Sequence, residues 1–231
     1  MKKRRNKKRW FSFYLLFVKI IYRKPKYKFI DHEDFPLDKT IYISNHVGSK
    51  VVPKLECYFP RLFRLWGAHQ MNEGIGSRFK YLFITYFNQK RHIPKFFSFF
   101  IALFVLPIMT LFYKGARFIS TYTDMRFSKT IKESIATIEN NESIVIFPEN
   151  SSDGYHDELK EFHPGFYMIA DKCYQKGIDL PIVKMYYQKK KNQFIVDKPI
   201  MFSEIKSTGK SRTEIAEEFR LRVNELGKMD I

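Results

Sequence analysis

The segment Thr40–Glu56, TIYISNHVGSKVVPKLE, is the part of the chain from which the fold can be predicted. Its short β-rich run, IYIS, ends in Asn45-His46, and a second β-rich run, SIVIF, ends just before Pro148-Glu149. Ligands of α/β sheets bind beyond the carboxyl ends of the strands. A histidine in such a place, beside a carboxylate, is suited to be a general base. We therefore expect the two strand ends to face each other and to form the reacting site.

The rest of the chain alternates predicted strands with predicted helices. Isoleucines at 131, 135 and 138 share one helical face, Ser128 can cap that helix, and β-like segments lie on both sides of it. A strand–helix–strand order favours parallel pairing. Further helices are expected at 51–60, 162–176 and after the cap Ser211, and further strands at 62–68, 181–187 and 193–196. The prediction is an α/β fold with a mixed, mostly parallel central sheet flanked by helices.

The positive charge is concentrated at the N-terminus. The formal net charge is +17, and residues 1–28 contain twelve Lys or Arg and no acidic residue, which leaves +5 for the other 203 residues. Nucleic-acid binders more often spread positive charge over a folded face. A basic segment beside an apolar run is typical of binding to anionic lipid. We expect membrane lipids as partners, and no specific nucleic acid. An alternative is a nucleic-acid or generic anionic-surface binder that uses this N-terminal segment.

Two apolar segments bear on the membrane. The run that follows the basic head, Trp10–Val18, is too short to cross a bilayer and fits an interfacial helix, although a core helix is the alternative. The second segment, 96–113, has eighteen uncharged residues and contains Pro107. It could span the membrane, form a surface-embedded helical hairpin, or lie buried in the core.

These segments define the expected domains. Residues 1–38 form a basic, aromatic membrane-interface anchor, in which 23–38 is a linker, and residues 39–231 form one α/β domain with an apolar insertion at about 87–113. Cys57 and Cys173 show no local motif and are expected to be reduced. The expected localisation is the cytoplasmic face of the inner or cell membrane.

Several motifs follow one another in a fixed order. They are Asn45-His46, Gly115–Thr121, Phe147-Pro148-Glu149, Phe162 with Gly165 and Ala170, Pro181-Ile182-Val183 and Lys198-Pro199-Ile200. This order, over roughly residues 40 to 228, resembles the glycerolipid acyltransferases related to bacterial lysophosphatidic acid acyltransferase. The resemblance implies a membrane-associated enzyme that moves a fatty acyl group from acyl-CoA or acyl-carrier protein to a lipid-like hydroxyl acceptor, such as a lysophospholipid.

The resemblance also implies which residues form the site. His46 takes the proton of the acceptor hydroxyl, backbone amides stabilise the oxyanion, and the Phe-rich segment lines an acyl channel. His46 and Glu149 are the expected catalytic residues. The expected substrate-binding residues are Asn45, Ser49, Lys50, Pro148, Asn150, Ser151 and Gly115. Neither a cofactor nor a metal is expected; His156 and His163 with Asp153 and Asp157 have an irregular spacing for a metal site.

The chain departs from the family's motifs at the catalytic acid. Val51 stands where the family has the Asp that orients the histidine. In serine proteases, neutralising such a carboxylate costs about 10⁴-fold in rate. Glu149 is the nearest substitute, and Asp153 and Glu56 are weaker candidates. If no acid substitutes, the alternative is a lipid-binding pseudoenzyme that keeps the fold without turnover.

The chain also departs at the cations that hold the acceptor's phosphate in the family. Thr121 lies near the place of one arginine, Asn150-Ser151-Ser152 replaces Gly-Thr-Arg, and His163 replaces a lysine. Each lost charge-assisted hydrogen bond is worth roughly 1.5–3 kcal/mol. The acceptor is therefore expected to lack the glycerol phosphate group, or to be held by other cations such as Lys50, Lys54 or Arg126.

Overall fold

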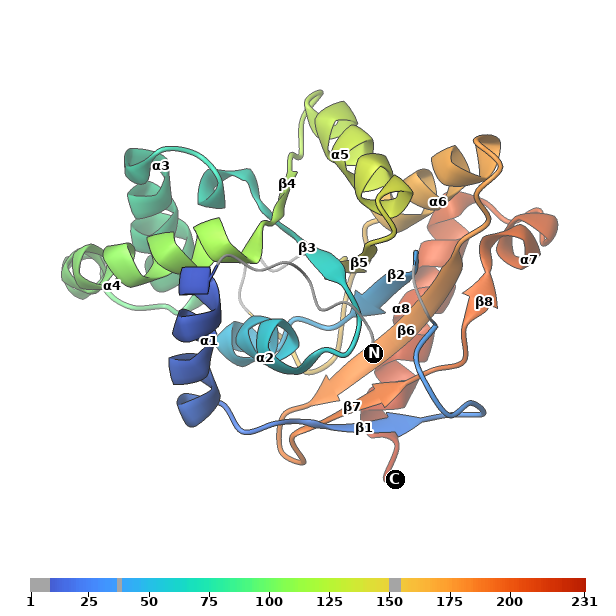
Figure 1. Ribbon diagram of the computed structural model, residues 1–231, viewed down its shortest axis with the longest axis horizontal. Coiled ribbons are helices and arrows are strands. Elements are labelled where there is room, and N and C mark those ends of the chain that lie inside the picture. Colours follow the sequence, from blue (N-terminus) through green and yellow to red (C-terminus); the bar gives the residue numbers. More distant parts are fainter. Residues whose placement is uncertain (1–8, 37–38, 150–154) are drawn as a thin grey trace.

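The computed structural model describes residues 9–36, 39–149 and 155–231 (Figure 1). Within these residues an eight-stranded sheet has the order β1-β7-β6-β2-β5-β3-β4, with β8 paired to β6. The strands are β1 (Lys26–Phe29), β2 (Ile41–Ser44), β3 (Phe63–Ala68), β4 (Ile119–Thr121), β5 (Ser143–Ile146), β6 (Pro181–Gln188), β7 (Gln193–Val196) and β8 (Ile200–Met201). The pairs β6–β7 and β6–β8 are antiparallel and the other pairs are parallel. The predicted mixed, mostly parallel sheet is confirmed.

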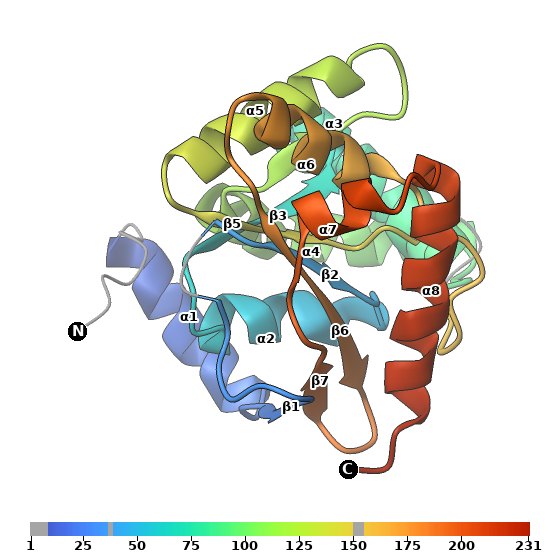
Figure 2. The same cartoon turned by 90° about the vertical axis from the view of Figure 1, so that its right-hand side faces the viewer.

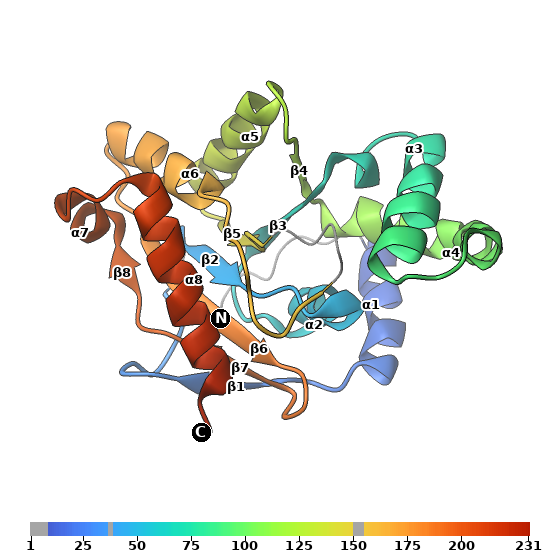
Figure 3. The same ribbon diagram turned by 180° about the vertical axis from the view of Figure 1, so that it is seen from behind.

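Helices cover both faces of the sheet, and a helical arm extends beyond β3 and β4 (Figures 1 and 3). In chain order the helices are α1 (Arg9–Ile21), η1 (Gly48–Lys50), α2 (Val51–Tyr58), η2 (His69–Met71), α3 (Ile75–Lys80), the π-helix η3 (Tyr81–Lys90), α4 (Lys95–Ala116), α5 (Phe127–Glu139), α6 (Gly165–Gln175), α7 (Phe202–Ser207) and α8 (Arg212–Lys228). The arm consists of α3, η3 and α4, which contact one another. Helix α8 runs along β6 (Figure 2).

The central strands separate two hydrophobic cores because successive side chains of a strand point to opposite faces. In β2, Tyr42 belongs to the core that includes α1, α2 and the end of α4. Its neighbours Ile41 and Ile43 belong to the opposite core, which includes α6, α7 and α8. All four residues of β2 and all four of β5 are buried, as expected for strands covered on both faces.

The segment predicted to be a linker at 23–38 contains a strand instead. β1 pairs in parallel with β7 at the edge of the sheet. Phe35, further along the same segment, is buried against Tyr27 and Tyr42. The expected boundary at 38/39 therefore does not separate the anchor from the domain, because residues 26–35 belong to the sheet and its core.

The two predicted helix caps had different outcomes. Ser211 caps α8, and together with Glu214 it forms a capping box. Ser128 does not cap α5; it lies inside the first turn, where its hydroxyl donates to the Met125 carbonyl. Helix α5 begins earlier than predicted, after Arg126, so Ser128 is not the residue that precedes the first helical turn.

Helices α1 and α4 each carry a buried face and an exposed apolar face. In α1, Phe11, Leu15 and Val18 are buried, whereas Ile20 is 78% exposed; in α4, Phe104 is 87% exposed. Helix α4 runs continuously through Pro107, so residues 96–113 form one helix and not a hairpin. Within the described residues, α4 is long and apolar enough to cross a membrane by length and composition.

Gly115, expected to bind substrate, has a packing role. It lies in α4, and a Cβ built on it would come within 1.9 Å of the Phe11 ring. This absence of a side chain lets α1 approach α4, where Phe11 also packs against Phe112. We therefore assign Gly115 to the α1–α4 contact.

Replacing Gly115 with alanine is expected to destabilise the protein by about 1–3 kcal/mol, because the new methyl group overpacks the Phe11 ring. Gly76→Ala in α3 is the matched control, since a Cβ there meets nothing within 4 Å. This control should be neutral or stabilising by up to about 1 kcal/mol through helix propensity. Urea denaturation measures both variants, and equal effects would contradict the assigned contact.

Candidate active site

Sheet register brings His46 and Glu149 together. The neighbouring parallel strands β2 and β5 pair Ile43 with Ile146. His46 and Glu149 each follow their paired residue by three positions, so the two strand ends place them side by side. The main-chain N–H of His46 donates a hydrogen bond of 2.5 Å to Oε1 of Glu149. The two strand ends therefore meet as predicted, through a contact between backbone and carboxylate.

The loop that carries Glu149 is hydrogen-bonded to the segment that precedes α6. Glu149 forms an isolated antiparallel bridge with Phe162, and the His163 N–H donates to the Pro148 carbonyl over 2.8 Å. Burial raises the pKa of Glu149 to about 7, against the opposing effects of the His46 N–H and of Lys90. Glu149 thus exchanges its proton near neutral pH.

The imidazole of His46 lies between aromatic rings. Its centroid is 4.8 Å from that of Tyr155, in a stacked arrangement, and 4.7 Å from that of Phe147, in an edge contact. Burial lowers the pKa of His46 to about 3, and the positive charge of Lys90 acts in the same direction. The ring is therefore neutral at physiological pH and can accept a proton. Among the described residues no carboxylate is hydrogen-bonded to its ring nitrogens.

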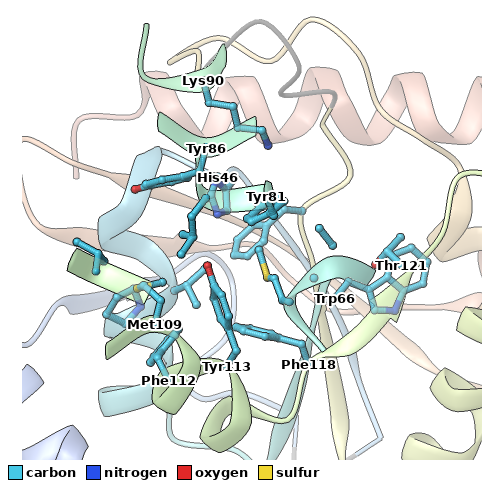
Figure 4. A pocket seen from close by; sticks show the side chains of 18 of the residues that line it. His46, Trp66, Tyr81, Tyr86, Lys90, Met109, Phe112, Tyr113, Phe118 and Thr121 are labelled. Atoms are coloured by element: carbon cyan, nitrogen blue, oxygen red, sulfur yellow. The ribbon is translucent and has the colours of Figure 1, made fainter. Parts of the chain in front are cut away.

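An apolar cavity of about 450 Å³ adjoins this pair (Figure 4). His46 and Glu149 line it together with residues of α1, α2, η3 and α4. Tyr14 and Val18 come from α1, and Val105, Met109 and Phe112 come from α4. Its volume is in the range typical of small-molecule sites. Helices α1 and α4 thus present one side to this cavity and exposed apolar side chains to the outside.

Lys90 is a site residue that the sequence analysis did not find. It ends the π-helix η3, lines the cavity, and lies with its Nζ 5.7 Å from the centre of the Tyr155 ring (Figure 4). Burial lowers the pKa of Lys90, whereas the charge of Glu149 raises it. No motif surrounds Lys90 in the sequence, because the packing of the helical arm places it here. Tyr155, six residues after Glu149, was also missed, because it belongs to none of the recognised motifs.

Two predicted substrate-binding residues have structural partners. Asn45 is fully buried, and its side chain accepts from the Tyr187 N–H (2.7 Å) and donates to the Tyr187 carbonyl (3.3 Å). It thereby continues the pairing of β2 with β6 beyond the strand. Pro148 is buried and does not line the cavity. We assign both to holding the strand ends in place.

The cations proposed as phosphate ligands lie elsewhere. Lys50 is exposed outside the cavity, Lys54 is buried and bonded to the side chain of Asn192, and Arg126 pairs with Asp124. Among the described residues that line the cavity, Lys90 is the one lysine, and none is an arginine. Thr121, near the place of the family's arginine, does line the cavity.

The structure gives a physical reason why position 51 carries a valine. Val51 is fully buried in the hydrophobic core with Val47 and Leu55, so a carboxylate there would be desolvated. Glu56, a weaker candidate acid, is buried but does not line the cavity. Asn150, Ser151 and Asp153 lie outside the described residues, as does the side chain of Ser49.

No protein-family model matches the chain, and no curated protein matches it significantly. Among solved structures it is similar to the 1-acyl-sn-glycerophosphate (LPA) acyltransferase PlsC from Thermotoga maritima, with 13% identity and a TM-score of 0.48. That similarity covers 96% of this chain and 90% of the other.

Among the described residues no group of three or more His, Cys, Asp or Glu could hold a metal ion.

Asn45→Leu should destabilise the protein, because the buried N–H and C=O of Tyr187 lose their partners at about 1–3 kcal/mol each. Lys50→Ala, an exposed position also predicted to bind substrate, should stay within about 0.5 kcal/mol of the wild type. Chemical denaturation measures both. If Asn45→Leu unfolds at the same denaturant concentration as the wild type and alters only substrate binding, the structural role assigned to Asn45 is contradicted.

Proposed function

We propose that the protein is a membrane-associated acyltransferase that moves a fatty acyl group from a thioester to a lipid hydroxyl. The observation that carries this proposal is the position of His46 and Glu149 at one apolar cavity, whose other walls include α1 and α4. The order of sequence motifs described above supports the same reaction. The acyl donor is acyl-CoA or acyl-carrier protein.

The reaction uses the neutral imidazole. His46 accepts the proton of the acceptor hydroxyl as the oxygen attacks the thioester carbonyl. The tetrahedral intermediate then expels the thiolate, which takes up the proton from the imidazolium. In this proposal ionised Glu149, whose carboxylate accepts the His46 main-chain N–H, stabilises the imidazolium, and the positive charge of Lys90 stabilises the oxyanion. The cation is costly in this buried site, as the low pKa of His46 indicates. The negative charge of Glu149 is therefore expected to have its largest effect while the proton is on His46.

The exposed apolar faces of α1 and α4 support a membrane-bound state. Their exposed large side chains are Trp10, Phe13, Leu16, Phe17, Ile20 and Ile21 on α1 and Phe96, Phe97, Phe99, Phe100, Leu103, Phe104, Ile108 and Leu111 on α4. Contiguous exposed apolar surface of this kind marks a membrane or protein contact. The basic N-terminal residues next to α1 favour an anionic membrane surface, which fits the cytoplasmic face.

One observation favours a second function. The ring nitrogens of His46 have no carboxylate partner among the described residues, and aromatic rings flank the imidazole. A lipid-binding protein with this cavity and without turnover would have the same features. Binding without catalysis is therefore the alternative that the first experiment distinguishes.

The full chain in phosphatidylcholine nanodiscs, supplied with oleoyl-CoA and a panel of lipid hydroxyl acceptors, is expected to form an acylated product. His46→Ala should lower kcat by at least about 100-fold, since general-base catalysis contributes 10²–10⁴. His32→Gln, outside the cavity, should keep the wild-type rate. Lipid binding without product in the wild type would support the alternative function.

Replacing Glu149 with glutamine removes the charge but keeps an oxygen that can accept the His46 N–H. We expect turnover to fall by orders of magnitude while the protein stays folded. In the wild type, kcat/KM should rise with pH around 7 as Glu149 loses its proton, and this rise should vanish in the variant.

The pH dependence of the free energy of unfolding tests the raised pKa of Glu149 independently of the reaction rate. Folded Glu149 binds its proton more tightly than the unfolded residue, whose pKa is 4.5. Raising the pH from about 4.5 to about 7 should therefore lower the free energy of unfolding of the wild type relative to Glu149→Gln. A near-normal rate with an unchanged pH profile in the variant would contradict the role of Glu149.

A further inference from the structure

Several residues with neutral hydroxyl groups line the cavity. Tyr81, Tyr86, Tyr113 and Tyr155 line it, as does Thr121 (Figure 4). Tyr81 and Tyr113 are only 8% and 4% exposed. Neither phenol forms a hydrogen bond to another described residue. The Oγ1 of Thr121 is buried and also has no hydrogen-bond partner among the described residues. Because the two phenols form no hydrogen bond within the described residues, each can donate one to a ligand in the cavity.

These hydroxyls belong to the surroundings of the proposed reacting pair. The Tyr155 ring stacks on His46, and Tyr81 and Tyr86 lie close enough to Tyr155 to raise its pKa further, after burial. In Figure 4 the hydroxyl oxygen of Tyr113 is directed into the cavity, on the side where His46 and Tyr81 lie. Burial raises the pKa of Tyr81, so its phenol remains a neutral hydrogen-bond donor at physiological pH.

The charges that line the cavity are close to balanced. Among the described lining residues, Lys90 contributes one positive charge and Glu149 contributes one negative charge when it is ionised, while His46 is neutral. A phosphate monoester would bring up to two negative charges into the cavity. The described lining residues do not carry the positive charge that would neutralise them. A group of neutral oxygens, in contrast, needs only hydrogen-bond partners.

We propose that the acyl acceptor is an uncharged lipid with a polyol head group, of the monoacylglycerol type. Tyr81 and Tyr113 hydrogen-bond the glycerol oxygens, and the apolar wall formed by α1 and α4 holds the acyl chain. This inference rests on the proposed function in so far as an acyl acceptor enters the cavity. It assigns to this chain a neutral acceptor in place of a phosphorylated one.

Binding can be followed through Trp66, which lines the cavity. The chain has two tryptophans, so a Trp10→Phe background leaves Trp66 as the only one. In nanodiscs of this background, 1-oleoylglycerol should change the Trp66 emission at a concentration at least about tenfold lower than 1-oleoyl lysophosphatidate. These two ligands differ only in the phosphate group.

Tyr81→Phe and Tyr113→Phe remove the hydroxyls and retain the rings. Each should weaken 1-oleoylglycerol binding by about three- to tenfold, the size of one net hydrogen bond. Tyr27→Phe is the matched control, because it removes a hydroxyl that has no hydrogen-bond partner among the described residues and lies outside the cavity. It should bind 1-oleoylglycerol like the wild type. Thermal unfolding verifies that each variant is folded.

The outcomes separate this inference from the proposed function. Tighter binding of lysophosphatidate, unchanged binding by both phenylalanine variants, or no Trp66 response to either lipid would overturn the neutral-acceptor assignment. Turnover with lysophosphatidate and none with 1-oleoylglycerol would overturn it while leaving the acyltransferase intact. Hydroxyl-dependent binding of 1-oleoylglycerol without turnover on any acceptor would support a neutral polyol lipid as the ligand and would contradict the proposed acyltransferase activity.

Discussion

The hydrogen bond from the His46 main chain to the Glu149 carboxylate joins the ends of two buried parallel strands. It exists because the Ile43–Ile146 register carries both residues the same distance past their strands. A carboxylate in this position stays partly desolvated, and its pKa rises to about 7. The same burial keeps the imidazole neutral. The site therefore combines a proton acceptor with an acid that titrates near neutral pH.

The core and the strand ends could be predicted from the sequence because they depend on local pattern. Apolar runs that end in Asn45-His46 and Pro148-Glu149 identify two buried strands and the edge at which their ends meet. Strand β1 was missed because its lysines and nearby Pro25 suggested a linker. The alternation of exposed Lys26 and Lys28 with half-buried Tyr27 and Phe29 is a period-two signal that could have identified an edge strand.

The cavity could not be predicted in the same way, because distant segments build it. Lys90 and Tyr81 come from η3, Tyr113 comes from α4, and Tyr155 follows the Glu149 loop. Nothing in the spacing of these residues indicates that they share one site. Conversely, Asn45 and Gly115 lie within recognisable motifs, yet the structure uses them for packing and pairing. A motif fixed the place of the site, and tertiary contacts decided which residues line it.

The proposed function requires that a lipid chain lies along the cavity wall formed by α1 and α4, with its reactive end beside His46. Photo-cross-linking in nanodiscs tests it most directly, with oleoyl lipids that carry a diazirine either near the carbonyl or at the chain end. The account predicts that the carbonyl-proximal probe labels the peptide that contains His46 or Tyr155. The chain-end probe should label the cavity side of α4 at Val105 or Met109. Labelling confined to outward-facing residues such as Phe104 and Ile20, with either probe, would contradict it.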